Sequence, residues 1–84
     1  MSNNSNTEWL AIFTYNGKEI MSSVPSLDII TYGSTYDETY SNTRKIIRNT
    51  INNLLKQGKE IPSTYDLSYD RGPNQELILI SSAK

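Results

Sequence analysis

The chain of 84 residues contains no cysteine and no histidine. It can therefore form neither a disulfide nor a thiolate metal site, and it lacks the side chain that most often serves as general base and metal ligand. No serine lies in a Gly-x-Ser-x-Gly motif, and the four glycines stand singly, so a hydrolase elbow and a phosphate-binding loop are both missing. We expect a protein that is not an enzyme and that holds no cofactor and no metal.

Charge and long apolar runs are also scarce. Eight Lys and Arg against nine Asp and Glu give a formal net charge of -1, whereas recognition of nucleic acid usually needs an excess of basic groups. No run approaches the roughly 20 apolar residues that span a bilayer, and the start MSNNSNTE does not resemble a signal peptide. We expect a cytoplasmic protein that has no membrane contact. Direct binding of nucleic acid is not favoured, although a local basic patch could still exist.

Length and composition indicate one small domain. Residues 1–7 are mostly Ser and Asn and predict a disordered tail, which leaves residues 8–84 as a single domain. A core of this size is marginal without disulfides or metal, so self-association is an expected source of stability. A homodimer, or a stable complex with a partner, is the expected state.

Three strands are predicted before the middle of the chain. Residues 8–15 (EWLAIFTY) lead into Asn-Gly at 16–17, which favours a tight type I′ hairpin turn. The second strand is predicted at 18–24 (KEIMSSV), followed by Pro25 at an edge or turn. The third strand is predicted at 27–33 (LDIITYG).

A long helix is predicted after Gly33, where the apolar period changes. Thr35 and Glu38 fit a capping box, and Gly58 supplies a C-terminal signal, which predicts a helix from about Tyr36 to Gln57. The expected apolar stripe consists of Tyr36, Tyr40, Thr43, Ile47, Ile51 and Leu54, flanked by Ile46, Thr50 and Leu55. One such helix should cover most of one sheet face.

The last predicted strand is 76–82 (ELILISS), after a connection over residues 58–75 that is rich in turn formers. A connection of that length indicates either a functional loop or a short ordered piece around residues 65–69. The resulting order is βββαβ, an α+β fold. We expect the last strand to return in parallel through a right-handed crossover and to lie beside the first.

Few side chains suggest chemistry. Asp37 and Glu38 could form a carboxylate pair, but they occupy the first helical turn, where the helix dipole favours negative charge. Asp66 and Asp70 could hold a cation, but a calcium loop needs more oxygen ligands at regular spacing, and ordinary turn formation is the better interpretation.

Three arginines and two tyrosines are the candidates for partner binding. Arg44 and Arg48, with Lys45 between them, lie one helical turn apart and could meet an acidic partner or phosphates, although a solvated helix face is the simpler interpretation. Tyr65, Tyr69 and Arg71 lie in the long connection, and Tyr and Arg are enriched at interface hot spots. They either contact a partner or fold back over the sheet. Four other aromatic residues are expected in the core, namely Trp9, Phe13, Tyr36 and Tyr40.

The segment from residue 24 to residue 63 carries an ordered set of short features. These are Pro25, Leu27, Thr31, Gly33, Thr35, Asp37, Glu38, Asn42, Leu54, Leu55, Gly58, Ile61 and Pro62. In this combination the segment resembles the HicB-type antitoxin domain, and the hairpin before it and the strand after it extend the resemblance over about residues 8–81. The resemblance implies a sheet similar to a truncated ribonuclease H sheet and a role in binding a small ribonuclease toxin.

The sequence also departs from that family. Only Asp28 stands where many members have Pro-Gly, and Thr39, Tyr40 and Thr43 stand where alanines are usual. Many members continue into a DNA-binding module, whereas this sequence stops at Lys84, so it resembles the partner-binding part alone.

Three hypotheses for function follow. The first is a non-catalytic, antitoxin-like interaction domain that binds and occludes a small basic ribonuclease toxin of the HicA type. The alternative is a stand-alone inhibitor, carried by a phage or mobile element, of a host defence nuclease or signalling system. The last is direct binding of RNA or single-stranded nucleic acid through tyrosines and the Arg44–Arg48 cluster, which would weaken steeply with salt.

Overall fold

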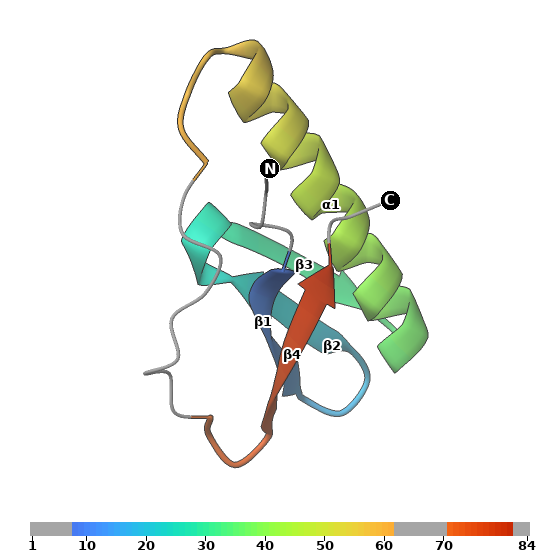
Figure 1. The fold of residues 1–84 in the computed structure, drawn as a ribbon. Coiled ribbons are helices and arrows are strands. Elements are labelled where there is room, and N and C mark those ends of the chain that lie inside the picture. Colours follow the sequence, from blue (N-terminus) through green and yellow to red (C-terminus); the bar gives the residue numbers. More distant parts are fainter. Residues whose placement is uncertain (1–7, 62–70, 82–84) are drawn as a thin grey trace.

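A computed structural model of the protein describes residues 8–61 and 71–81. The elements are β1 (Glu8–Tyr15), β2 (Ile20–Val24), a short 3-10 helix η1 (Pro25–Leu27), β3 (Ile29–Gly33), α1 (Tyr36–Lys56) and β4 (Gln75–Ser81). Within these ranges four strands form one sheet, and one long helix packs on it (Figure 1). The predicted α+β fold class with βββαβ order is confirmed. The tail predicted over residues 1–7 lies outside the described residues.

The strand order is β3-β2-β1-β4, and every neighbouring pair is antiparallel. The predicted place of the last strand beside the first is confirmed, but its predicted parallel direction is wrong. β4 begins beside the end of β1, where the Tyr15 amide donates to the Asn74 carbonyl over 2.9 Å. Residues 57–74 allow this reversal, because an extended chain reaches about 3.3 Å per residue and can return along the whole sheet before β4 starts.

The hairpin between β1 and β2 is wider than predicted. Tyr15 pairs with Ile20, so residues 16–19 form a four-residue loop, closed by a 3.3 Å hydrogen bond from the Asn16 amide to the Glu19 carbonyl. Gly17 has a positive φ of 95°, whereas Asn16 does not have a positive φ. The type I′ prediction is therefore wrong, because that turn requires positive φ at both central residues.

The chain between β2 and β3 turns through η1 rather than continuing as a strand. Pro25 opens η1, as expected for a residue that cannot donate to a ladder. Asp28 closes it in the left-handed conformation, with φ 58° and a 3.3 Å bond from its amide to the Pro25 carbonyl. β3 consequently begins at Ile29, two residues later than predicted.

The ends of α1 follow local rules. The Thr35 hydroxyl accepts from the Glu38 amide over 3.1 Å, and the Glu38 carboxylate accepts from the Ser34 amide over 2.6 Å. The hydrogen bond from the Ser34 amide to the carboxylate holds the pKa of Glu38 below its usual value. At the other end Lys59 and Gly58 donate back to the carbonyls of the last turn in a Schellman arrangement. The predicted capping box and helix start are confirmed, and the helix ends at Lys56 with Gln57 as its cap.

The core lies between α1 and the helix-facing side of the sheet. Its fully buried large side chains are Trp9, Phe13, Val24, Ile47 and Ile80. At the centre of the contact Thr43 lies 2.6 Å from the Thr39 carbonyl and 2.8 Å from the Ser22 hydroxyl. Because a carbonyl only accepts, Thr43 donates to Thr39 and Ser22 donates to Thr43. The buried hydroxyl groups thus form hydrogen bonds with each other and with the helix backbone where the helix and the sheet approach closely.

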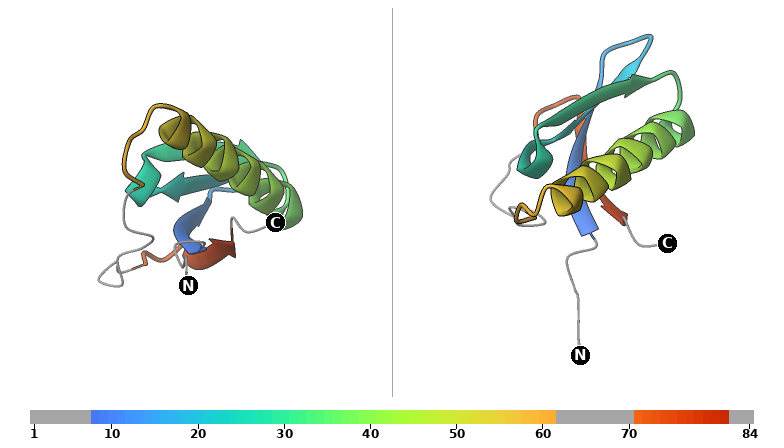
Figure 2. Two further views of the ribbon diagram at one scale, coloured as in Figure 1. Left: turned by 45° about the horizontal axis from the view of Figure 1, so that its top comes forward. Right: turned by 90° about the horizontal axis from the view of Figure 1, so that it is seen from above.

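The helix covers less of the sheet than predicted. α1 packs chiefly against β3 and less against β2 and β4, and its C-terminal part extends beyond the strands (Figures 1 and 2). Leu55 is accordingly 58% exposed, and Tyr36 at the other end is 41% exposed. Trp9 and Phe13 are core residues as predicted, but the core assignment of Tyr36 is wrong; Tyr40 is half-buried against the core.

Candidate functional site

Arg44 and Arg48 lie where predicted, on one side of α1. They line an open groove of about 430 Å³. Its lining residues all belong to the helix and are Tyr40, Ser41, Arg44, Lys45, Arg48, Asn49 and Asn52. This lining has three cationic side chains and no carboxylate, so the groove attracts anions. Arg44 is half-buried and its Nε donates to the Ser81 carbonyl over 2.9 Å, which ties the helix to the end of β4.

Arg71 lies at the opposite end of β4 and does not join this groove. Its guanidinium donates to the Gln75 carbonyl over 3.2 Å, where the Gln75 side chain also accepts from the Gly72 amide over 2.7 Å. Gln75 and Ser81 are the two ends of β4, so Arg71 and Arg44 contact carbonyls about 20 Å apart. Arg71 therefore braces the turn into β4. The other two candidates, Tyr65 and Tyr69, lie outside the described residues.

A surface that the sequence did not predict lies where α1 begins. The ring centroids of Phe13 and Tyr36 are 5.5 Å apart, and those of Tyr36 and Tyr40 are 6.2 Å apart in a stacked arrangement. Beside them the Tyr15 hydroxyl donates to the Glu76 carboxylate over 2.8 Å. Together with Asp37 in the first turn of α1, Tyr15, Tyr36, Tyr40 and Glu76 form what we call the tyrosine surface.

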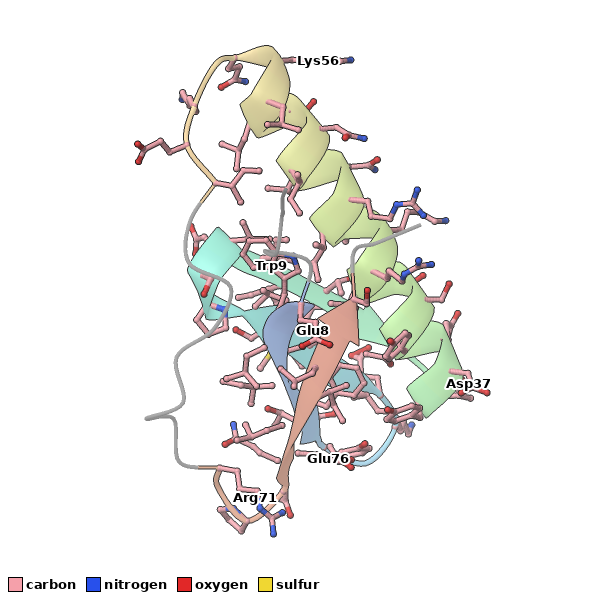
Figure 3. All side chains as sticks on the ribbon, in the orientation of Figure 1. Glu8, Trp9, Asp37, Lys56, Arg71 and Glu76 are labelled. Carbon is pink, nitrogen blue, oxygen red and sulfur yellow. The ribbon has the colours of Figure 1, made fainter. Side chains whose placement is uncertain are left out.

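Charge and exposure distinguish the tyrosine surface from the rest of the helix side. Asp37 and Glu76 both lie at the end of the molecule where α1 begins (Figure 3), and both are exposed. Desolvation, the hydrogen bond to Glu76 and the negative charge of Glu76 raise the pKa of Tyr15 to about 12. The surface therefore presents the Tyr15 phenol in its neutral form, with two further tyrosine rings, next to carboxylates.

A signal for this surface was present in the helix pattern. Thr39, Thr43 and Ile47 are the fully buried helix residues, and they are spaced by four. Their line is the centre of the buried stripe, and Tyr36 lies a turn before its first member, at the helix end. Apolar periodicity assigns the tyrosines and the threonines of α1 to the same stripe. In the structure the smaller threonine side chains occupy the fully buried centre of that stripe.

The sheet face opposite α1, which we call the open face, is apolar. Its largest exposed side chains are Ile30 (61%), Leu79 (49%), Tyr32 (48%) and Leu77 (36%). Leu10 and Ile12 of the central strand lie between them in register with Leu79 and Leu77, and they are buried. Exposed apolar area of this kind is typical of interaction surfaces.

Among residues 8–61 and 71–81 no group of three or more His, Cys, Asp or Glu side chains is placed to hold a metal ion. No helix within these ranges is long and apolar enough to cross a membrane. No protein-family model matches the sequence, and no curated protein is significantly similar to it.

Proposed function

We propose that the protein is a non-catalytic interaction domain that uses the tyrosine surface to bind a basic partner protein. The observation that carries the proposal is the cluster of three tyrosines beside the carboxylates of Asp37 and Glu76. Tyrosine supplies large contact area at little conformational cost and is enriched at interface hot spots. Carboxylates next to it favour a basic partner over an acidic one.

The first partner to test is a small basic ribonuclease toxin of the HicA type, because of the resemblance over residues 8–81. The mechanism is steric and electrostatic. A ribonuclease holds RNA on a basic surface, and a folded domain whose carboxylates face that surface competes with the phosphates and excludes the substrate. A near-neutral protein suffices for this, since Asp37, Glu38 and Glu76 place three carboxylates near the start of α1.

The test measures RNA cleavage by a short basic protein encoded beside the gene for this chain. The wild-type domain should bind that protein and block cleavage, and Tyr36→Ala should weaken the inhibition by about tenfold or more, as removal of a tyrosine hot spot does. Tyr32→Ala is the matched control, because Tyr32 is 48% exposed, similar to the 41% of Tyr36, but lies on the open face. Wild-type protein that neither binds nor inhibits refutes the toxin as partner.

The alternative, an inhibitor of a host defence nuclease or signalling system, has one specific observation in its favour. The groove on α1 gathers Arg44, Lys45 and Arg48 without a carboxylate, which suits an anionic signalling molecule better than a basic toxin. Calorimetry with cyclic and linear nucleotides tests this. Binding that is lost in Arg48→Gln and kept in Tyr36→Ala would favour the alternative over the toxin.

A further inference from the structure

The outer edge of β4 is unusual for a strand at the border of a sheet. β4 pairs with β1 over seven consecutive residues without a bulge, contains no proline or lysine, and has Glu76 as its single charged residue. Natural edge strands usually carry prolines, lysines, bulges or a covering element, because a free edge recruits other strands. β4 has none of the first three protections.

The register shows which backbone groups point outward. The Tyr15 amide donates to Asn74, so position 74 faces β1. Groups in an antiparallel ladder alternate along the strand, and residues 76, 78 and 80 therefore face β1 as well. The amides and carbonyls of Gln75, Leu77, Leu79 and Ser81 face outward.

The two ends of this edge are already occupied. Arg71 donates to the Gln75 carbonyl, and the Gln75 amide donates to the Gly72 carbonyl. At the far end Arg44 donates to the Ser81 carbonyl. Within the described part of the chain, the amides and carbonyls of Leu77 and Leu79 have no such partner, and they form a segment of four hydrogen-bonding groups.

The opposite edge of the sheet differs. β3 has only five residues, α1 lies along it, and Asn42 donates its side-chain amide to the Tyr32 carbonyl over 3.0 Å. Of the two edges, β4 is thus the one with a longer exposed ladder.

We propose that β4 is a homodimer interface, in which two copies pair antiparallel about a twofold axis through Ile78. Only this register places Leu77 of each copy opposite Leu79 of the other. It also uses the amides and carbonyls of Leu77 and Leu79, the four backbone groups of each strand that are unpaired among the described residues. Two four-stranded sheets then become one eight-stranded sheet. The four leucines gather on the joined open face, where each is at least 36% exposed in a single copy.

Charge favours a second copy as the occupant. In this register Gln75 of one strand lies opposite Ser81 of the other. Glu76, whose side chain is on the helix-facing side, then comes within one residue step, about 3.3 Å along the strand, of the Ser81 carbonyl to which Arg44 of the second copy donates. Glu76 of one copy therefore lies near Arg44 of the other, and the twofold axis produces this pair of opposite charges twice.

The interface is small. One pair of seven-residue strands with four leucines falls below the roughly 1,200 Å² of buried area that separates stable complexes from weak ones. We expect a dissociation constant on the order of 100 µM. The dimer and the proposed function both involve Glu76, but the tests below use the isolated chain, so their outcome does not depend on a partner protein.

Sedimentation equilibrium over rising concentration tests the dimer. At about 1 mM, ten times the expected dissociation constant, about four-fifths of the wild-type chains should be dimeric and the average mass should approach twice the monomer mass. Leu79→Lys, which puts a charge at the centre of the edge, should remain monomeric at this concentration. Ile30→Lys is the matched control, because Ile30 is an exposed residue on the same face but at the β3 edge. It should dimerise like the wild type. A monomeric wild type, or loss of the dimer in both variants, overturns the proposal.

Disulfide cross-linking tests the proposed register of the two β4 strands without adding a charge to the edge. The chain lacks cysteine, so Leu77→Cys and Leu79→Cys each introduce a single thiol. Directly opposed residues lie about 5.5 Å apart between Cα atoms, within the range of a disulfide, whereas residues displaced by two positions are beyond 7 Å. An oxidised mixture of the two variants should form at least fivefold more cross-linked dimer than either variant alone. Equal yields overturn the proposed axis.

Discussion

At the scale of single residues, Asp28 and Gly33 are placed at the two ends of β3 for opposite reasons. Asp28 adopts the left-handed conformation although it has a Cβ, and Gly33 has none where the chain passes close to the backbone of Thr39 in α1. At each of these positions the structure predicts whether a mutation raises or lowers the free energy of unfolding.

Asp28→Gly should stabilise the protein. The left-handed conformation costs a residue with a Cβ about 1–2 kcal/mol, less for Asp, and the added freedom of the unfolded chain offsets part of the gain. We expect a net increase of about 0.5–1 kcal/mol in the free energy of unfolding by urea. Asp28→Ala is the control and should destabilise, since it keeps the Cβ and loses the short polar side chain that helps Asp to tolerate this conformation. A stabilising effect of alanine contradicts this explanation.

Gly33→Ala should destabilise strongly. A Cβ at this position would lie 2.7 Å from the Thr39 nitrogen and 2.8 Å from its Cα, and helix backbone cannot rotate away as a side chain can. We expect a loss of about 3 kcal/mol in chemical unfolding, at the upper end for overpacking. At Gly17 nothing lies within 4 Å of such a Cβ, so Gly17→Ala should cost less, from its positive φ alone. Equal losses would exclude the close approach as the cause.

At the scale of elements, α1 is divided into a packed half and an extending half. Ile47 is fully buried, whereas Leu55 is 58% exposed beyond the sheet. We expect Ile47→Ala to reduce the free energy of unfolding by about 2–5 kcal/mol, as for other buried truncations. Leu55→Ala should change it by less than about 0.5 kcal/mol. Similar losses, measured by denaturant unfolding, would mean that the whole predicted stripe is packed.

The features of the fold that could be predicted from the sequence are those that depend on neighbouring residues. The capping box at Thr35 and the glycine end signal at Gly58 depend on residues a few positions apart, so local pattern sufficed. The direction of β4 depends on the connection between α1 and β4, and a connection of this length permits either direction. The tyrosine surface was missed because periodicity identifies an apolar stripe without showing where the sheet beneath it ends.

At the scale of the whole molecule, stability should depend on alkaline pH through Tyr15. Its pKa is about 12 in the folded protein against 10.0 for an ordinary tyrosine. A raised pKa means that the neutral phenol is favoured by folding, so this contribution is complete below pH 10 and is lost as pH rises toward 12. Between these values the wild type should lose stability more steeply than Tyr15→Phe. Parallel profiles in urea unfolding would contradict the assignment.

The strand order has a consequence for how the protein folds during its synthesis. β1 is the first strand in the chain and a central one in the sheet, and its side chains bond residues 61 positions later, at Glu76 and Gln75. Chains are synthesised at about 5–20 residues per second, and contacts distant in sequence form late. The nascent domain must therefore wait for its last strand before the central strand is paired on both sides. A chain cut before β4 would expose Leu10 and Ile12 on an unpaired edge, and it would be recognised by chaperones and proteases before it could bind any partner.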